Sequence, residues 1–173
     1  MLRLFVCLLS VLLSSCATYR NPPRTVSHVN LKRYMGTWYE IASFPNVFQR
    51  GCRCTTATYA LHGKNAVSVL NRCYKGDSLK LSEAKGRAWS VSSKNNKLKV
   101  QFFWPFSGDY WILYLTPGYN QVIVGSPDRK YLWILSRTRK ITKQKYKQLL
   151  TIAKSDGFDI AYLVKTNQSC TKK

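Results

Sequence analysis

The stretch that decides the fold is Gly36-Thr37-Trp38-Tyr39-Glu40-Ile41-Ala42, and its partner about 100 residues later is Tyr131-Leu132-Trp133-Ile134-Leu135-Ser136-Arg137. The first stretch places Gly-x-Trp at the start of a β-rich region, and the second ends the last strand with an Arg. Gly-x-Trp alone is too short to identify a fold. The pair at this separation, with several short strands between, predicts one β domain that the two stretches open and close.

Eight short strand-like segments follow one another along this domain. Turn signals such as His62-Gly63-Lys64-Asn65 and Pro117-Gly118 separate them. Leu98, Val100 and Phe102 alternate with polar residues, which gives their strand one inner face. Evenly spaced strands joined by tight turns predict an all-β fold, an eight-stranded antiparallel up-and-down barrel. The predicted strands are 37–45, 54–61, 66–74, 83–92, 97–104, 109–116, 120–126 and 130–137.

One longer helix follows the strands. Thr142 is a suitable N-cap, apolar residues recur at helical spacing as far as Ala153, and Gly157 ends the pattern. The lysines lie off this apolar stripe, so we expect the helix to pack on the outer wall of the barrel. The alternative is an amphipathic helix lying on a membrane. A short helical turn is expected at 31–34, and an extended tail leads from 158 to Cys170.

The N-terminus carries the features of an exported lipoprotein. Residues 4–13 form an apolar run, too short for a membrane-spanning helix of about 20 residues but typical of a signal peptide. The run ends in Leu13-Ser14-Ser15-Cys16, which looks like a bacterial lipobox in which the Cys16 thiol takes a diacylglyceryl group. The alternative is a secreted protein with a Cys near its cleavage site. We expect a signal peptide at 1–15, a lipidated tether at 16–29 and the barrel domain, with its helix and tail, at 30–173.

The charge balance is strongly basic, with 28 Lys and Arg against 7 Asp and Glu. Such a surplus suggests an anionic partner. Export argues against nucleic acid, and the basic residues are scattered rather than concentrated in one arm. We interpret them as a solvated outer surface facing anionic headgroups or lipopolysaccharide. In Gram-negative lipoproteins an Asp after the lipidated Cys commonly means retention in the inner membrane, so Ala17 at this position favours the outer membrane. We expect the protein on the periplasmic side of that membrane.

Four cysteines remain in the exported domain once Cys16 is assigned to the lipid: Cys52, Cys54, Cys73 and Cys170. An even number of cysteines in an oxidising compartment predicts two disulfides, for which three pairings exist. Neither His stands at a ligand spacing from them, so no metal site is expected. The residues alone leave the pairing open.

These motifs resemble the lipocalin family over about residues 30–170, and most of all its bacterial outer-membrane lipoproteins and its apolipoprotein D-like group. The resemblance implies a ligand cup rather than a catalytic cleft. It implies a structural floor in which Arg137 lies across the ring of Trp38, with Gly36 beside them. It also implies that Cys54, at the start of the second strand, is tied to the tail as Cys54–Cys170, which leaves Cys52–Cys73.

Alternation and the resemblance together select the inward-facing residues of the upper barrel as the ligand site. This set is apolar with a few polar groups, the usual composition of a small-ligand pocket. The expected ligand is a fatty acid or a lysophospholipid with its chain inside and its charged end at the mouth, and no cofactor is expected. The predicted ligand-binding residues are Tyr59, Val69, Asn71, Val100, Phe102, Tyr110, Ile112 and Trp133.

We therefore expect a membrane-anchored, ligand-binding protein, monomeric or weakly dimeric, that transports or stores lipid or maintains the envelope. One alternative is an enzyme on the same fold, which would need a free Cys52 or Cys73, or general acid–base work by Glu40 or a Tyr. No Gly-x-Ser-x-Gly motif or paired acids support it. The other alternative is an interaction lipoprotein that works through its basic surface.

Overall fold

The computed structural model describes residues 19–63 and 66–170. The predicted signal peptide and Cys16 lie outside these residues. Within the described ranges no helix combines the length and the apolar character that a membrane span requires.

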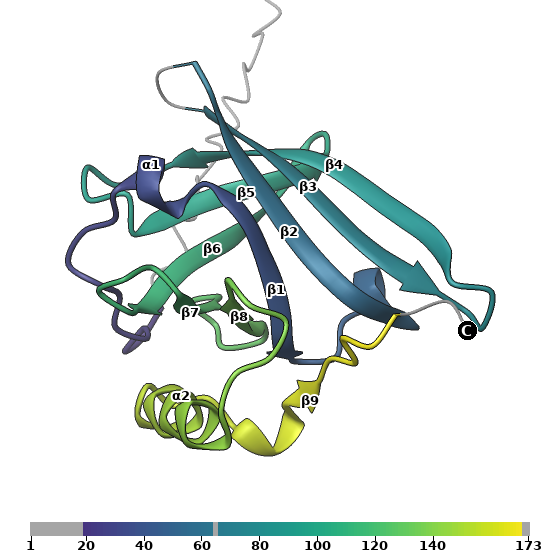
Figure 1. The fold of residues 1–173 in the computed structure, drawn as a ribbon. Helices are drawn as coiled ribbons and strands as arrows, with labels where there is room; N and C mark the ends of the chain where they lie inside the picture. Colours follow the sequence, from purple (N-terminus) through teal and green to yellow (C-terminus); the bar gives the residue numbers. More distant parts are fainter. Residues whose placement is uncertain (1–18, 64–65, 171–173) are drawn as a thin grey trace, which may run out of the picture.

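The eight predicted strands are all present and form one antiparallel up-and-down barrel (Figure 1). Each strand pairs with the next along the chain, and β1 closes the sheet by pairing with both β8 and β2. The strands are β1 Gly36–Ser43, β2 Cys52–His62, β3 Ala66–Lys75, β4 Lys80–Ser90, β5 Lys97–Phe103, β6 Phe106–Leu115, β7 Gln121–Gly125 and β8 Leu132–Ser136.

Strand boundaries differ from the prediction by up to three residues, most clearly in β4 and β6. β4 begins at Lys80 rather than 83 because its ladder with β3 runs unbroken from Ala66↔Trp89 to Lys75↔Lys80. β6 begins at Phe106 rather than 109 because Phe106 pairs with Phe103 across the turn. Backbone pairing with a neighbouring strand extends each strand past the point where its own alternation stops.

The helices lie where the sequence places them. α1 (Leu31–Tyr34) precedes β1, and α2 (Lys143–Ser155) begins at Thr142, whose hydroxyl accepts a hydrogen bond from the Lys145 amide. Gly157 follows α2 with a φ of +85°, a conformation that suits glycine. Two short 3-10 helices, η1 (Val47–Gln49) and η2 (Ile160–Tyr162), lie in the β1–β2 connection and in the tail.

A ninth strand, β9 (Val164–Lys165), extends the sheet beyond the prediction. It pairs antiparallel with the end of β1, Ala42 opposite Lys165, and the Thr166 amide donates to the carbonyl of Ile41. Two residues carry no recognisable strand pattern. The pairing arises because the tail runs past β1 on its way to the disulfide at Cys170.

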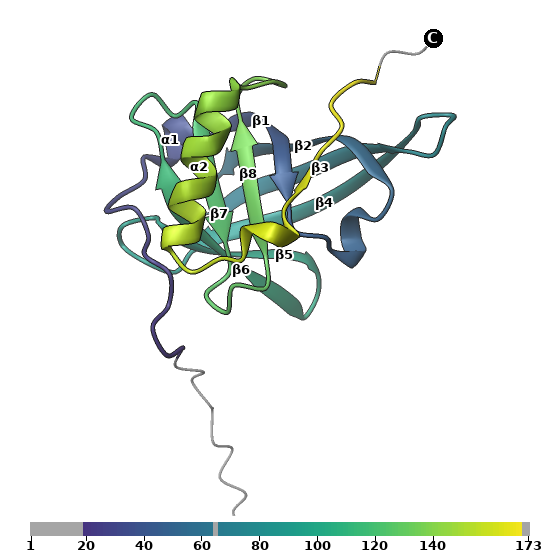
Figure 2. The ribbon, with the colours of Figure 1, turned by 90° about the horizontal axis from the view of Figure 1, so that it is seen from below.

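Two hydrophobic clusters stabilise the fold, one inside the barrel and one outside it. The inner cluster includes Trp38, Ile112 and Val124, all fully buried. The outer cluster lies between the barrel wall and α2, where Ile123 and Ile134 pack with Leu149. The helix therefore covers the outer wall as expected, as Figure 2 also shows.

The end of the segment expected as a tether at 16–29 contacts the barrel, and only its residues from 19 onward are described. Val29 is fully buried and Val26 packs against the inner cluster. The Val26 amide donates to the carbonyl of Ile112, and the Asn96 side chain donates to the carbonyl of Val26. Residues 26–29 therefore pack on the barrel, because two apolar side chains and several backbone groups find partners there.

Candidate functional site

The two ends of the barrel are chemically different. The order of the strands shows which strand-to-strand connections lie at each end. The end near α1 is called the closed end here. The opposite end, called the mouth, carries the β1–β2, β3–β4, β5–β6 and β7–β8 connections. β1 runs from the closed end at Gly36 to the mouth at Ser43.

The floor at the closed end is built on Trp38 and Arg137. The Arg137 guanidinium lies 3.8 Å from the centre of the Trp38 ring, and the indole NH donates to the carbonyl of Tyr34 at 2.9 Å. Arg137 also donates to a set of backbone carbonyls around the floor. These carbonyls belong to Arg33, Tyr34, Met35, Thr37 and Tyr119.

Gly36 is required at this position for two reasons. Its φ is +92°, and a Cβ added there would lie 3.3 Å from an Arg137 guanidinium nitrogen. A larger residue would therefore strain the backbone and push the guanidinium out of place. Gly36, Trp38 and Arg137 together close the barrel, which is the structural role proposed for them from sequence.

Three tyrosine hydroxyls meet just above the floor. Tyr110 shares hydrogen bonds with Tyr34 at 2.7 Å and with Tyr59 at 3.0 Å. Burial raises the pKa of Tyr59 to about 12 and holds the pKa values of Tyr34 and Tyr110 well above their ordinary range. The three groups are therefore neutral hydrogen-bonding groups at physiological pH. Sequence reasoning selected Tyr59 and Tyr110 but missed Tyr34, because its position depends on how α1 folds under the barrel.

Little space remains in the lowest layer. A cavity of about 10 Å³, room for about one water molecule, is lined in part by the three tyrosines. Its walls come from α1 and from the inner faces of β2 to β6. The lowest layer of the barrel therefore has no room for an acyl chain.

Seven of the eight predicted ligand residues belong to the inner cluster or pack against it. Tyr59, Val69 and Ile112 are buried, whereas Val100, Phe102, Tyr110 and Trp133 are partly buried. The eighth, Asn71, lies opposite Ala57 on β2 and Ala84 on β4. The structure therefore brings the predicted set to one inner face, with exposure increasing toward the mouth.

The inner face of β4 is lined with small residues. Gly86 and Ala84 lie directly opposite Val69 and Asn71 of β3, so the four residues share one side of the sheet. Ala84 is exposed although it shares the inner side with buried Val69. The inner side of β4 is thus accessible to solvent at Ala84. Ala84 was not among the sequence-selected residues because a lone Ala gives no signal.

Two polar atoms on the barrel wall lack partners among the described residues. The side-chain oxygen of Asn71 and the hydroxyl of Thr55 are both buried and accept or donate no hydrogen bond there. Buried polar groups in native proteins are usually satisfied, and exceptions indicate a water, an ion or a ligand. Asn71 was expected as a polar ligand contact from sequence; Thr55 was not.

A polar network fixes the β1–β2 connection across the mouth. The Gln49 amide NH₂ donates to Glu40 at 2.6 Å, and the Gln49 carbonyl accepts from the Trp133 indole at 3.0 Å. Glu40 also accepts from Thr166 and Ser43. Burial raises the pKa of the Glu40 carboxyl, and these three donors oppose that rise. Trp133 therefore has a structural partner at the mouth as well as an inner position.

Both disulfides of the predicted pairing are present. Cys52 bonds to Cys73 and links β2 to β3, and Cys54 bonds to Cys170 and links β2 to the tail. All four cysteines of the described residues are therefore bonded, and the thiol-based enzyme alternative has no free thiol among them.

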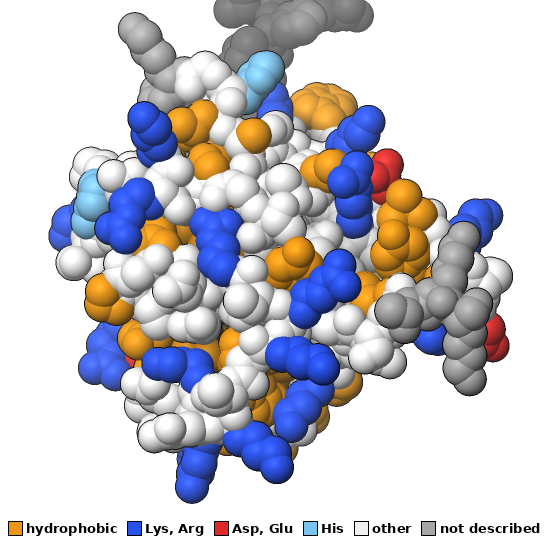
Figure 3. Space-filling model, in the orientation of Figure 1, with side chains coloured by type: hydrophobic (Ala, Val, Ile, Leu, Met, Phe, Trp, Pro, Cys, Tyr) orange, Lys and Arg blue, Asp and Glu red, His pale blue; other side chains and the backbone are white. Residues whose placement is uncertain are grey.

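A second concave region lies outside the barrel, between β1, α2 and β9. This groove has a volume of about 490 Å³. Figure 3 shows Lys and Arg side chains around hydrophobic surface in this region, at the lower edge of the view. The lining residues are Ile41, Arg139, Lys140, Ile141, Lys143, Tyr146, Lys165 and Thr166.

No residue of this groove is acidic, although all seven acids of the chain lie in the described residues. Five acids form ion pairs elsewhere, and Glu40 and Asp159 are held by local hydrogen bonds. The Lys165 ammonium lies 4.9 Å from the centre of the Tyr146 ring. The groove thus places basic side chains next to the apolar side chains of Ile41, Ile141 and Tyr146.

Comparison with known proteins agrees with this architecture. A family model described as a lipocalin-like domain matches residues 29–168. The chain is a lipocalin. Temperature-induced lipocalin-1 of Arabidopsis thaliana is 41% identical over 162 residues, covering 89% of this chain and 87% of that protein. The outer membrane lipoprotein Blc of Escherichia coli K12 is 40% identical over 151 residues, covering 85% of each chain.

More distant lipocalins share the fold. Apolipoprotein D of Macaca fascicularis is 31% identical over 155 residues, covering 84% of this lipocalin and 80% of the relative. Insecticyanin from the tobacco hornworm superimposes with a TM-score of 0.68 at 22% identity, covering 85% of each chain. Lobster apocrustacyanin A1 superimposes with a TM-score of 0.67 at 20% identity, covering 86% and 91% of the two chains. These two structures support the barrel alone.

Proposed function

We propose that this lipocalin binds a single acyl chain, from a fatty acid or a lysophospholipid, in the upper half of its barrel. The chain lies against Val69, Val100 and Phe102, above the tyrosine layer, and the polar end lies toward the mouth. Each buried CH₂ contributes about 0.8 kcal/mol, so a long chain binds without detailed shape recognition. The protein then carries or stores lipid in the cell envelope.

The observation that carries the proposal is the open inner wall next to Asn71. An exposed, inward-facing Ala84 leaves space there, and the partnerless Asn71 oxygen offers an acceptor to a ligand hydroxyl. The similar outer membrane lipoproteins support an envelope location. The lipobox ending in Cys16 supports attachment to the outer membrane through acyl chains, with the barrel in the periplasm.

The direct test is mass spectrometry of lipids that co-purify with the native protein, followed by titration of a fluorescent fatty acid into delipidated protein. Ala84→Phe fills the inner wall and is expected to weaken binding by about tenfold or more, because it removes the space for several CH₂ groups. Ala60→Phe is the matched control, since Ala60 is exposed on β2. No retained lipid and no binding by the unaltered protein would reject the proposal.

A second candidate function rests on the basic groove. Four cations line it, none of them in an ion pair within the described residues, and Tyr146 and Ile141 provide an apolar floor. This composition suits the phosphate headgroup of an anionic lipid. The protein would then also act as an interaction lipoprotein through its surface.

The groove is tested with glycerol 3-phosphate as a soluble probe, monitored by NMR. Saturable, salt-sensitive shifts at Lys143 and Lys165 that disappear in the doubly substituted Lys143→Glu, Lys165→Glu variant would support it. Lys85→Glu, at an exposed position on β4, is the control. Equal shifts in all variants would mean diffuse charge attraction and would exclude a site.

A further inference from the structure

The C-terminal tail completes the barrel wall where two strands separate. β2 pairs with β1 only up to Tyr39, and further along β1 the tail strand β9 takes its place opposite Ala42. The Gln168 side chain spans the gap, because its NH₂ donates to the carbonyls of Glu40 at 2.8 Å and Thr55 at 3.0 Å. We call the part of the wall between Glu40 of β1, Thr55 of β2 and Gln168 of the tail the seam.

The seam lies between the basic groove and the inside of the barrel. On the outside, Lys165 and Thr166 of the tail line the groove. On the inside, Glu40 lies opposite Leu135 of β8, which belongs to the inner cluster, so the two side chains share one side of the sheet. The Thr166 hydroxyl donates to the Glu40 carboxylate, and this one side chain therefore contacts both regions.

Side-chain hydrogen bonds continue from Glu40 to the mouth. The other carboxylate oxygen of Glu40 accepts from the Gln49 NH₂ at 2.6 Å, and the Gln49 side-chain carbonyl accepts from the Trp133 indole at 3.0 Å. Gln49 ends η1 in the β1–β2 connection, and Trp133 is one of the predicted ligand residues. The side chains of Thr166, Glu40, Gln49 and Trp133 thus connect the groove with the upper barrel.

Glu40 depends on neutral donors and has a second donor within the seam. It is 5% exposed and forms no ion pair within the described residues, and its carboxylate accepts from Ser43, Gln49 and Thr166. The register of β1 with β2 places Thr55 next to Glu40 on the same side of the sheet. The Thr55 hydroxyl is buried and has no partner among the described residues. Glu40 therefore has two arrangements, one with Thr166 and Gln49 as donors and one turned toward Thr55.

An anion in the groove favours the second arrangement. Thr166 carries one hydroxyl hydrogen, which it donates either to Glu40 or to an anion, but not to both. An anion that accepts this hydrogen also repels the carboxylate, because both are negative and Glu40 is buried. The carboxylate then gains the unused Thr55 hydroxyl and loses Gln49.

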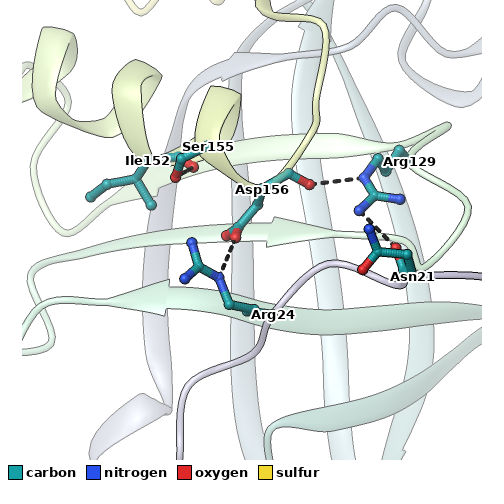
Figure 4. A network of polar contacts seen from close by, with 6 residues as sticks. All are labelled: Asn21, Arg24, Arg129, Ile152, Ser155 and Asp156. Carbon is teal, nitrogen blue, oxygen red and sulfur yellow. Dashed lines mark hydrogen bonds and ion pairs between the residues drawn. The ribbon is translucent and has the colours of Figure 1, made fainter.

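The helix side of the groove is fixed. α2 buries Leu149 in the outer cluster. Figure 4 shows the end of the helix, where Asp156 pairs with Arg24 at 3.0 Å and its carbonyl accepts from Arg129. Arg129 belongs to the β7–β8 connection at the mouth and also donates to the carbonyl of Asn21, so the N-terminal segment leaves the domain at this end. An anion in the groove is therefore expected to rearrange the tail side rather than the helix.

We propose that the basic groove and the barrel cavity are coupled through Thr166, a positioning residue for the mouth. A phosphate group in the groove takes the Thr166 hydrogen, Glu40 turns to Thr55, and Gln49 is released. The Trp133 indole then loses its partner more often, so the β1–β2 connection opens more readily over the cavity. This inference rests on the second proposed function and adds that the groove regulates access to the barrel. By linkage, whatever fixes the mouth weakens anion binding in the groove by the same factor.

The test follows the Trp133 indole hydrogen by NMR while glycerol 3-phosphate is added to the native protein at constant ionic strength. Exchange of this hydrogen with solvent reports how often its bond to Gln49 opens. We expect exchange to become about fivefold faster at saturation, with the same midpoint as the shifts at Lys143. The Trp89 indole is the internal control, because Trp89 pairs with Lys99 on β4 and β5 and contacts none of the four connecting side chains.

Variants assign the effect to single hydroxyls. Thr166→Val should make Trp133 exchange fast without the probe and unresponsive to it, whereas Thr166→Ser keeps the hydroxyl and should retain the response. Thr55→Val removes the second donor of Glu40 without touching the groove, so it should suppress the response. Thr151→Val is the matched control, because the exposed Thr151 hydroxyl donates to a carbonyl within α2.

The contrary outcomes differ in what they reject. Saturable shifts at Lys143 with unchanged Trp133 exchange would reject the coupling and leave the groove site standing. A response that persists in Thr166→Val would show that it does not pass through this hydroxyl, which overturns the inference. No saturable shift at Lys143 would reject the groove function, and with it the anion that the coupling requires.

Discussion

The closed end and the mouth of this barrel are stabilised in different ways. At the closed end, Arg137 satisfies backbone carbonyls around the floor while it covers the Trp38 ring, and three tyrosines satisfy one another. At the mouth, two disulfides link the strands and the tail, polar oxygens lack partners on the wall, and aromatic rings face solvent.

The difference indicates that the two ends have different roles. The Arg137 guanidinium and the tyrosine hydroxyls of the floor already have hydrogen-bond partners, so we do not expect ligand binding to change the floor. The mouth has buried polar atoms without partners among the described residues and exposed apolar side chains, so it has groups that the proposed ligand could contact, and two disulfides hold it in shape. The following substitutions test this contrast, in order of decreasing effect.

Removing the long-range disulfide should have the largest effect on stability. Cys54 and Cys170 are 116 residues apart, and Cys52 and Cys73 are 21 apart. The chain-entropy relation gives a loss of about 5 kcal/mol for a Cys54→Ser, Cys170→Ser variant and about 3 kcal/mol for Cys52→Ser, Cys73→Ser. Urea unfolding measures both. Equal losses would mean that strain or local packing, rather than loop closure, sets their contribution.

Arg137→Ala should lower the free energy of unfolding by about 3 kcal/mol, because it leaves several carbonyls of the floor without donors and exposes the Trp38 ring. Arg139→Ala is the control, since Arg139 is exposed and lies 5.5 Å from the Tyr39 ring. Urea midpoints and fatty-acid affinity are measured together. A loss of affinity as large as the loss of stability would contradict the view that the floor is purely structural.

The buried tyrosines should make the free energy of unfolding fall at alkaline pH. The pKa of Tyr59 is about 12 in the folded protein and about 10 when unfolded. The unfolded chain therefore releases this proton first, so the contribution of Tyr59 to stability is constant below about pH 10 and falls between about pH 10 and 12, by on the order of 2 kcal/mol. Tyr59→Phe should reduce that fall. Tyr162→Phe, at a residue 65% exposed, should leave it in place.

The smallest expected effect concerns Asn71, whose side-chain oxygen lacks a partner among the described residues. Asn71→Leu removes the partnerless oxygen, so it should leave stability unchanged or slightly raised. It should weaken lysophospholipid binding by about fivefold, because a hydrogen bond to the glycerol hydroxyl is lost. Binding of a plain hydrocarbon probe should be unchanged in the same titration. Equal weakening for both probes would show that Asn71 acts only through the volume of its side chain.

Much of the fold could be predicted because its signals are local. Alternation in 97–102 and turn residues such as Pro117-Gly118 report directly on strands and turns, and Thr142 and Gly157 mark the ends of α2. The pairing of Trp38 with Arg137 was available from the family pattern. The burial of Val26 and Val29 was not predicted, because Pro and Arg in this segment resemble a linker, while that burial depends on a surface formed by distant strands.

The candidate site could be predicted only in part, for a related reason. Side-chain alternation identified the inner face, so Val69, Val100 and Phe102 were found. Tyr34, Thr55 and Ala84 were not found, because a helix, a bulged strand and a small residue give no periodic signal. The exposed aromatic residues of the mouth connections also escaped notice, since a sequence does not distinguish an aromatic residue in the core from one at an open edge.

The sequence by itself determined that this chain is a lipocalin with a barrel and a packed helix, because those properties depend on residues near one another or on a fixed family pattern. The lipobox at Cys16 stays a prediction from sequence. Only the tertiary structure decided which barrel end carries the N-terminal exit, where the cations gather without acids, and which aromatics stay exposed. Those properties depend on which distant strands become neighbours. Closing the barrel through β1 sets all three at once, because it fixes every connection at one end or the other.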